Sequence, residues 1–111
     1  MAYTRQLEYE TLRSRDSATF TGSYQTLGTP LANPCSIIKL VNNSNVLVTI
    51  SVDGVNDHDI APAGSFWLYD VTSDSPQESG SIFRKQGTQY YVRGTASTGL
   101  VYLVVQYVVQ M

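Results

Sequence analysis

The chain has 111 residues, the size of one domain, and a formal net charge of −2. Only 14% of its residues are charged, against a usual value of about 25%. This weak, slightly acidic charge predicts neither a nucleic-acid partner nor an anionic membrane partner. No apolar run approaches the roughly 20 residues needed to span a bilayer. A small domain with so few charges is expected to have part of its surface covered by another molecule.

The single cysteine, Cys35, excludes an intramolecular disulfide and a zinc site built from several cysteines. It follows Pro34 beside an apolar run, and no histidine is placed to activate it, so we expect a structural thiol rather than a nucleophile. The opening MAYTRQLEYE has the features of neither a signal peptide nor a transit peptide. We therefore expect a protein that is made in a reducing cytosol.

Residues 1–16 differ from the rest of the chain because they combine six charged residues with the interleaved apolar and aromatic residues Tyr3, Leu7, Tyr9 and Leu12. An extended arm that ends in a strand is favoured over a short amphipathic helix, since no N-cap signal is present and Tyr and Thr are weak helix formers. The sequence thus predicts an N-terminal arm at 1–16 and a β domain at 17–111.

The first part of the β domain reads as a strand, a loop and a hairpin. Residues 17–25 predict a strand, and 26–34, with two prolines and a glycine, predict a loop. The stretch 36–52 contains two β-branched apolar runs, which are joined by the polar residues 42–45. An Asn/Ser cluster between such runs is typical of a hairpin turn.

The next part begins with Asp53-Gly54, which predicts a tight turn, followed by a polar loop at 56–64. Residues 65–71 predict an aromatic strand with period-two alternation. Phe66 and Leu68 then point to one face, and Trp67 and Tyr69 point to the other. A hydrophilic loop at 72–81 and short strands at 82–84 and 89–93 are expected to follow.

The last run, 100–109, is apolar on both of its faces. One face holds Leu100, Tyr102, Val104 and Val108, and the other holds Val101, Leu103, Val105, Tyr107 and Val109. A strand with one face in water would alternate apolar and polar residues. We therefore expect one face to belong to the core and the other to be covered by a facing sheet, the arm or another chain.

About eight short runs separated by turn signals predict an all-β fold. The expected architecture is a single-domain, two-sheet β-sandwich of jelly-roll or Greek-key type, with the N-terminal arm added to it.

The chemistry-bearing residues give weak signals. His58 lies between Asp57 and Asp59 with Asp53 nearby, but this spacing does not match a calcium loop, and one histidine without a placed nucleophile makes no triad. A turn-forming loop is the favoured interpretation. The sequence predicts no catalytic, cofactor-binding or metal-ligating residue, so we expect a protein that is not an enzyme.

The aromatic residues leave three interpretations open. They can pack in a sheet, form a protein interface, or make a platform for sugar rings as in carbohydrate-binding modules. The residues concerned are Tyr24, Trp67, Tyr69, Tyr90 and Tyr91.

From Ser36 onward the chain resembles small virion proteins of tailed bacteriophages. The similarity lies in SIIKLVNNSNVLVTISVDGVNDHDIAPAGSFWLYD and in KQGTQYYVRGTASTGLVYL. These are turn-and-strand signatures over about two thirds of the chain, and the arm has no matching pattern. Within this group, the chain is similar to the decoration or staple proteins on the capsids of epsilon-fifteen-like podophages.

This resemblance implies a β-sandwich on the outer capsid surface of the virion, assembled in the host cytoplasm. It implies binding to the major capsid protein of an HK97-type shell, a clamp between neighbouring capsomers, and self-association, with a dimer favoured over a trimer. No nucleic acid or membrane partner is expected. We expect the arm to reach the capsid protein, strand aromatics to make the self-contact, and removal of 1–15 to leave the fold intact. The expected interface residues are Tyr3, Arg5, Leu7, Tyr9, Arg13, Arg15, Trp67, Tyr69 and Tyr107.

The sequence is also compatible with three other functions. A receptor- or carbohydrate-binding module of a tail or fibre predicts that Trp67 and Tyr69 are exposed in a groove. A head–tail or baseplate component differs only in its number of copies per particle. An enzyme would need a polar pocket around His58.

Overall fold

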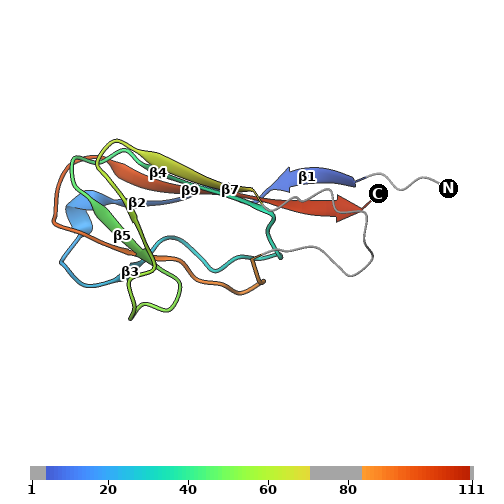
Figure 1. Ribbon diagram of the computed structural model, residues 1–111, viewed down its shortest axis with the longest axis horizontal. Helices are drawn as coiled ribbons and strands as arrows, with labels where there is room; N and C mark the ends of the chain where they lie inside the picture. Colours follow the sequence, from blue (N-terminus) through green and yellow to red (C-terminus); the bar gives the residue numbers. More distant parts are fainter. Residues whose placement is uncertain (1–4, 71–83, 111) are drawn as a thin grey trace.

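The computed structural model describes residues 5–70 and 84–110. It is an all-β domain of two stacked antiparallel sheets, as Figure 1 shows. The first sheet contains β1 (Arg5–Tyr9), β2 (Arg13–Asp16), β4 (Ile37–Asn42), β7 (Phe66–Asp70) and β9 (Leu100–Gln110). The second contains β3 (Gln25–Thr26), β5 (Val48–Ser51), β6 (Asp59–Ala61) and β8 (Tyr91–Arg93). Both the all-β class and the sandwich architecture predicted from the sequence are confirmed.

The strand order is that of a jelly roll. The sheets run β2-β9-β4-β7 and β3-β8-β5-β6, and β1 also pairs with β9. The pairs are nested along the chain, from the two outermost strands to the two innermost. They are β2 with β9, β3 with β8, β4 with β7, and β5 with β6. Successive pairs alternate between the sheets, so the chain behaves as one long hairpin wrapped around the core.

The core lies between the sheets and follows the period-two alternation of the strands. Ile38 and Leu40 of β4 and Leu103 of β9 point inward and are buried. They pack with Val48, Ile50 and Val92 of the second sheet in one cluster. Each fully buried aliphatic side chain of this kind contributes about 1.5–3 kcal/mol to folding.

The hairpin expected at 36–52 is wrong, because its two runs belong to different sheets. β4 pairs with β7 and β9, whereas β5 pairs with β6 and β8. The buried amide of Asn42 makes the corner between them. Its nitrogen donates to the carbonyl oxygens of Val46, Ala61 and Pro62, and its oxygen accepts from Ser44. Polar turn chemistry is present as expected, but it turns the chain from one sheet into the other.

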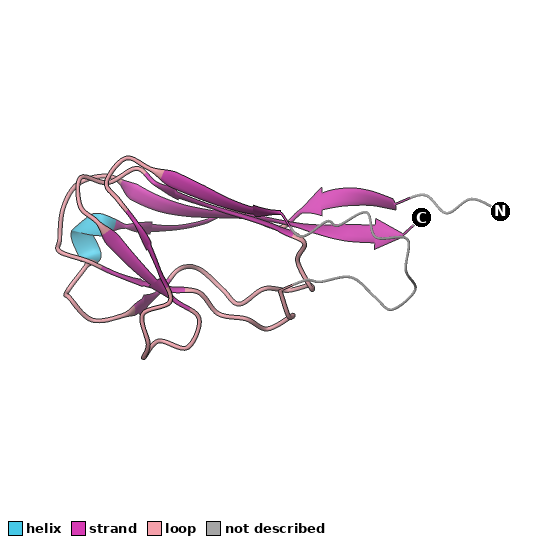
Figure 2. Ribbon diagram, viewed as in Figure 1, coloured by secondary structure: helices cyan, strands magenta, loops and turns pink. Residues whose placement is uncertain are grey.

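Two local expectations are also corrected. The strand predicted at 17–25 is a short 3-10 turn, Ser17–Thr19, followed by a loop, with pairing only at Gln25–Thr26 (Figure 2). The loop predicted at 56–64 contains β6, which pairs with β5. The elements that form in these two stretches are only two or three residues long, so side-chain periodicity carries little information about them.

The N-terminal segment is extended from Arg5 onward, as favoured from the sequence, but no boundary separates an arm from the domain after Asp16. β2 pairs with Leu100–Leu103 of β9, and β1 pairs with the end of the same strand. From Tyr9 to Arg13 is four residue steps, whereas the paired residues Gln106 and Leu103 are three steps apart. One extra residue therefore forms a β-bulge at 10–12.

Beyond this bulge, β1 and the end of β9 form a two-stranded ribbon. The pairing of β4 with β9 ends at Ile37 and Gln106, so past that point β1 is the one strand of the described residues that pairs with β9. Figure 1 shows the ribbon projecting past the second sheet. Two-stranded ribbons are marginally stable in water unless a further surface covers them.

Among the described residues, no helix has the length and apolar character that crossing a membrane requires.

Candidate functional site

The face of the first sheet that points away from the core is mainly apolar. We call it the outer face. Because antiparallel partners share a face, the register assigns its members. They are Leu7 and Tyr9 of β1, Ser14 and Asp16 of β2, Ile37, Lys39 and Val41 of β4, Phe66, Leu68 and Asp70 of β7, and Leu100, Tyr102, Val104, Gln106 and Val108 of β9.

These residues form aligned rows across the sheet. One row contains Phe66, Val41 and Tyr102, and the next contains Leu68, Lys39 and Val104. A third contains Asp70, Ile37, Gln106 and Tyr9, and the ribbon adds Val108 opposite Leu7. With about 4.8 Å between strands and 3.3 Å per residue, the part of the outer face centred on β4 covers roughly 300 Å². Apolar patches of this size on a small domain are often functional.

Several large side chains of the outer face are strongly exposed. Tyr9 is 70% exposed, Phe66 67% and Leu68 52%, and Leu7, Leu100 and Val108 are also exposed. Of the parts of the chain that the structure describes, no strand lies over this face, which is the upper side of the sheet in Figure 1. The sequence predicted that both faces of the last strand would be covered. Among the described residues only the inward face is covered, which leaves the outer face of this part of the chain open to another molecule.

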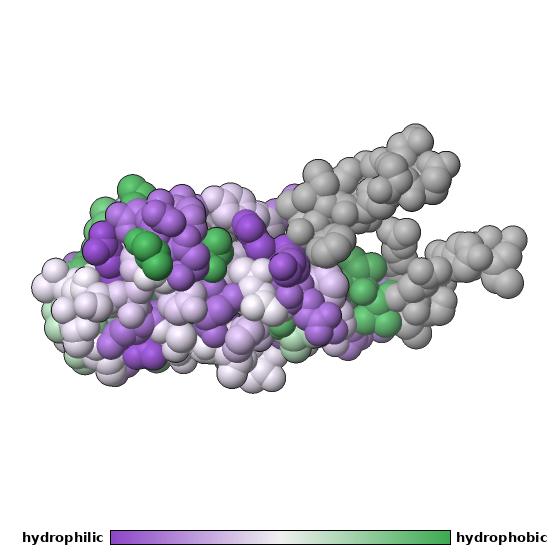
Figure 3. Space-filling view, turned by 90° about the horizontal axis from the view of Figure 1, so that it is seen from below, coloured by the Kyte–Doolittle hydropathy of each residue, from purple (hydrophilic) through white to green (hydrophobic). Residues whose placement is uncertain are grey.

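The exposed face of the second sheet has a different character. Figure 3 looks onto that side and shows mainly hydrophilic and neutral residues, with apolar residues as separate spots. There Arg93 donates to the Asp57 carboxylate at 3.0 Å and lies over the Tyr24 ring. Tyr24 also donates to Asp57. Burial raises the pKa of Tyr24 to about 12, and the Asp57 carboxylate adds to this effect. Tyr24, Asp57 and Arg93 thus bind one another and form a closed polar cluster.

Two open hollows lie on the same side of the molecule. One, of about 530 Å³, is lined by Val52, Arg84, Lys85, Gly87, Thr88, Gln89 and Tyr91. The other, of about 470 Å³, is lined by Gly22, Val46, Leu47, Thr49, Arg93, Gly94 and Thr95. Neither lining includes a histidine, a cysteine or a carboxylate, so neither brings together the convergent titratable groups that catalysis uses.

The acidic loop around His58 forms turns. Asp53 accepts hydrogen bonds from the backbone N–H groups of Asn56 and Val55 and from the Asn56 and Ser51 side chains, and these bonds hold its pKa well below the usual range. His58 Nδ1 accepts from Val52 N–H at 3.1 Å. The turn interpretation is therefore confirmed for Asp53, whereas Asp57 accepts from Tyr24 and Arg93, and Asp59 belongs to β6. In the described part of the chain, no three His, Cys, Asp or Glu residues are grouped as metal ligands would be.

Cys35 is fully buried, as expected of a structural thiol. Burial, with the neighbouring Glu10 carboxylate adding to it, raises the pKa of the thiol to about 12. The thiolate form needed for nucleophilic chemistry is thus absent near neutral pH.

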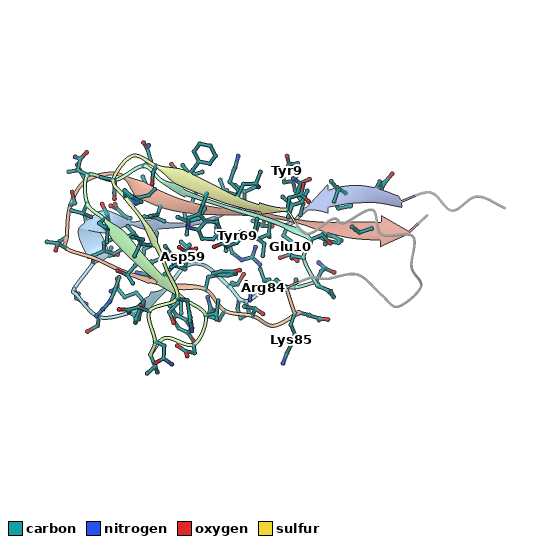
Figure 4. The ribbon with its side chains drawn as sticks, in the orientation of Figure 1. Tyr9, Glu10, Asp59, Tyr69, Arg84 and Lys85 are labelled. Carbon is teal, nitrogen blue, oxygen red and sulfur yellow. The ribbon has the colours of Figure 1, made fainter. Side chains whose placement is uncertain are left out.

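The residues expected from the N-terminal segment separate into two groups. Leu7 and Tyr9 lie on the outer face and are exposed. Figure 4 shows Tyr9 pointing away from the domain, while its neighbour Glu10 points inward. Arg5 belongs to β1, opposite Gln110, and its side chain is outside the described part. Tyr3 also lies outside the described residues.

Arg13 and Arg15 correct the expectation of a free basic arm. Arg13 is 6% exposed, and its guanidinium donates to Glu10, to the Thr29 carbonyl and to the Pro30 carbonyl. Arg15 is partly exposed, and its Nε donates to the Thr26 carbonyl at 2.6 Å. The reason is the bulge, since the extra residue places both arginines on the inward side of β2. Arg13 is therefore not accessible to a partner, and Arg15 is already bound within the chain.

The expected strand aromatics mostly point inward. Trp67 is partly buried and packs against the core, with its ring centroid 4.6 Å from that of Tyr69. Tyr69 is 44% exposed at the sheet edge, and its hydroxyl donates to Asp59 (Figure 4). Tyr107 is partly buried against the core from the inward face of β9. These side chains therefore do not contribute to the outer face.

Sequence reasoning missed Phe66, Leu68, Leu100 and Val108 as candidate site residues. The signal was present, because the alternation had already placed Phe66 and Leu68 opposite Trp67 and Tyr69. The predicted parity is right, but the outward pair is Phe66 and Leu68 rather than Trp67 and Tyr69. A strand with apolar residues at both parities cannot show which set faces the core without knowledge of its neighbours.

Comparison with known proteins gives no match, either to a protein-family model or to a curated protein sequence.

Proposed function

We propose that this chain is a non-enzymatic structural protein of a virion. It binds the outside of an icosahedral phage capsid and clamps neighbouring capsomers of the major capsid protein. Binding occurs through the outer face of the first sheet, and the more polar second sheet faces solvent. Neither a nucleic acid, a membrane nor a cofactor takes part.

The observation that carries the proposal is the exposure of the outer face. Phe66 and Leu68 are more than half exposed on a sheet whose opposite side is a fully packed core. Leaving this much apolar surface in water has a free-energy cost, and covering it with protein recovers about 25 cal/mol per Å². A flat, rigid sheet also requires little ordering on binding, which lowers the entropic cost of association.

The capsid as the partner is supported by the sequence resemblance to decoration proteins of tailed phages. The jelly roll is compatible with it, since this fold occurs in viral capsid proteins, although it also occurs in lectins and enzymes. A clamp needs two contacts on one rigid body, and two modest contacts joined in this way bind with an avidity above either alone.

Self-association is part of the proposal, and a dimer is favoured over a trimer because an interface made from one shared patch is two-fold. The ribbon of β1 and the end of β9 is the surface we assign to it. Leu7, Tyr9 and Val108 are exposed on one side of the ribbon, whereas the other side combines Tyr107 and Val109 with Gln6 and Glu8. A two-stranded ribbon with one exposed apolar side is stabilised when a second copy packs on that side.

The test uses capsid shells prepared without this protein and the purified full chain. We expect saturable binding with hundreds of copies per shell, and at least 10-fold weaker binding of Phe66→Ser and Leu68→Ser. Thr49→Ala, a change on the second sheet, serves as the matched control and is expected to bind normally. About a dozen copies or fewer per particle would instead support a head–tail or baseplate component.

The alternative of a receptor- or carbohydrate-binding module has less support. It relies on Trp67 and Tyr69 as an open platform, whereas Trp67 packs against the core and the Tyr69 hydroxyl is bound to Asp59. Binding to a glycan array that is lost in Tyr69→Ala but retained in Phe66→Ser would favour this alternative over the capsid proposal.

A further inference from the structure

A single ammonium group lies near the centre of the outer face. Lys39 is in the middle of β4, with Leu68 beside it on β7 and Val104 beside it on β9. Its side chain is partly exposed and makes no ion pair with any residue that the structure describes. Among the described outward side chains of the first sheet, two others are charged. Asp70 already interacts with another group of its own chain, and Asp16, at the end of β2, accepts a hydrogen bond from the Ala18 N–H.

We propose that Lys39 orients the partner on the outer face. The part of this face around β4 binds a protein of a different kind, whose apolar surface carries a carboxylate placed to meet the Lys39 ammonium. This inference rests on the proposed function and adds the chemistry of the surface that the partner presents.

The argument begins with the solvation of Lys39. A partner that covers Leu68 and Val104 also removes the ammonium between them from water. Burying an unpaired charge is costly, whereas a charge that meets an opposite charge with good geometry is tolerated. The apolar side chains supply most of the contact area, and the ion pair selects one position of the partner over positions shifted along the sheet.

A second copy of this chain does not fit the same place. A two-fold contact centred on this part of the face would bring two Lys39 ammonium groups together, and like charges across an interface are unfavourable. An off-centre contact would need a carboxylate from the second copy's outer face, but Asp70 already interacts with a group of its own chain, and Asp16 at the end of β2 accepts a hydrogen bond from the Ala18 N–H. Self-association is therefore directed to the ribbon, whose outward Leu7, Tyr9 and Val108 are uncharged.

The chain offers a matched control because it has one other lysine, Lys85, which is exposed beside the hollow on the second sheet (Figure 4). We would measure the binding of the full-length Lys39→Met, Lys39→Glu, Lys85→Met and Lys85→Glu variants to capsid shells that lack this protein. Removing one member of a desolvated charge pair is expected to weaken binding about 30-fold or more. The Lys85 variants should stay within about threefold of the unmodified chain, and all four should keep its melting temperature.

Zero-length cross-linking identifies the group opposite Lys39. A carbodiimide adds to a carboxylate and activates it as an O-acylisourea. A lysine amine within contact distance then attacks the acyl carbon to form an amide, and the carbodiimide leaves as a urea that carries one carboxyl oxygen. We expect Lys39 to be linked to an aspartate or glutamate of the capsid protein. A link from Lys39 to a carboxylate of a second, isotopically labelled copy of this chain would overturn the inference.

The two proposals fail in distinguishable ways. If the unmodified chain binds shells and the Lys39 variants bind equally well, the orienting role of Lys39 is wrong and the proposed function stands. If the unmodified chain does not bind shells at all, the proposed function is overturned, and this inference with it.

Discussion

The Glu10 carboxylate and the Arg13 guanidinium form an ion pair at 2.7 Å, with side chains only 5% and 6% exposed. Glu10 also accepts from the Asn33 amide and the Ala32 N–H, and Arg13 donates to the carbonyls of Thr29 and Pro30. The β-bulge thus ties the N-terminal segment to the loop that precedes β4. Gly28 leaves room for it, since a Cβ there would lie 2.5 Å from Arg13 Cγ.

Replacing Arg13 by alanine is expected to destabilise the domain by about 3–5 kcal/mol, because it leaves a buried carboxylate without its partner. Urea unfolding followed by tryptophan fluorescence measures the change. Arg93→Ala is the control, since it breaks the exposed pair with Asp57 and should have a much smaller effect. Equal effects of the two substitutions would show that the Glu10–Arg13 pair has no special role in stability.

Truncation at two positions tests whether the N-terminal segment is an arm. The sequence predicts that removing 1–15 leaves the fold intact, but this deletion also removes Glu10, Arg13 and most of β2. We expect the chain without 1–9 to melt near the full-length temperature and the chain without 1–15 to melt at least about 10 °C lower. Thermal unfolding by circular dichroism compares them. Similar melting temperatures would restore the arm interpretation.

The pH dependence of stability should reveal Glu10. Burial raises the pKa of Glu10, but hydrogen bonds from Asn33, Arg13 and the Ala32 N–H outweigh it, so the net pKa is lowered. A lowered folded-state pKa means that the carboxylate stabilises the fold above its unfolded value of about 4.3. This contribution is lost as the pH falls through the folded-state value.

Glu10→Gln provides the comparison for this pH effect. The difference in unfolding free energy between the unmodified chain and the variant should be constant from pH 7 to about pH 5 and should shrink below about pH 4. Urea unfolding at several pH values measures it. A difference that grows on acidification would mean that the folded-state pKa of Glu10 is raised rather than lowered.

The buried amide of Asn42 is predicted to be essential to the corner between the sheets. Asn42→Ala leaves the carbonyls of Val46, Ala61 and Pro62 without this donor, and we expect a loss of roughly 2–5 kcal/mol. Asn42→Asp should be at least as harmful, because a carboxylate would face those same oxygens. Asn45→Ala, which removes an exposed bond to Thr98, is the control in chemical unfolding. A mild effect at Asn42 would show that the backbone alone fixes the corner.

Alternation within single strands could be predicted from the sequence, but the partners of those strands could not. The two parities of 66–70 and of 100–108 were assigned correctly, because period two is a local property of an extended chain. The hairpin predicted at 36–52 is wrong because the direction of the chain after β4 depends on Asn42. The hydrogen bonds of this residue reach Ala61 and Pro62, about twenty residues along the chain. The sequence predicts an accessible Arg13, whereas the structure buries it, because a β-bulge reverses the inward and outward sides of the strand and leaves no mark in the residue pattern.

The candidate site was predictable to the same degree. Low charge and the doubly apolar last strand indicated that part of the surface is covered by another molecule. They could not show which parity is exposed, since Phe66 and Trp67 are equally suited to a core. Only the position of the second sheet decides that Trp67 packs inward and Phe66 points to solvent.

Phe66 and Trp67 therefore offer the sharpest test, because adjacent aromatic residues of one strand should respond in opposite ways. Phe66→Ser removes a side chain that is 67% exposed, so we expect a stability change within about 0.5 kcal/mol. Trp67→Ala removes a ring that packs against the core, and we expect a loss of at least about 2 kcal/mol.

Binding to capsid shells should show the reverse order. Phe66→Ser is expected to bind at least 10-fold more weakly, because its ring lies on the outer face beside Val41. Trp67→Ala, measured at a temperature at which it remains folded, should bind within a few-fold of the unmodified chain. Sedimentation of the shells with labelled protein measures this. Loss of binding in Trp67→Ala together with full binding in Phe66→Ser would place the interface on the opposite side of β7, because side chains of neighbouring residues in a strand cannot share a face.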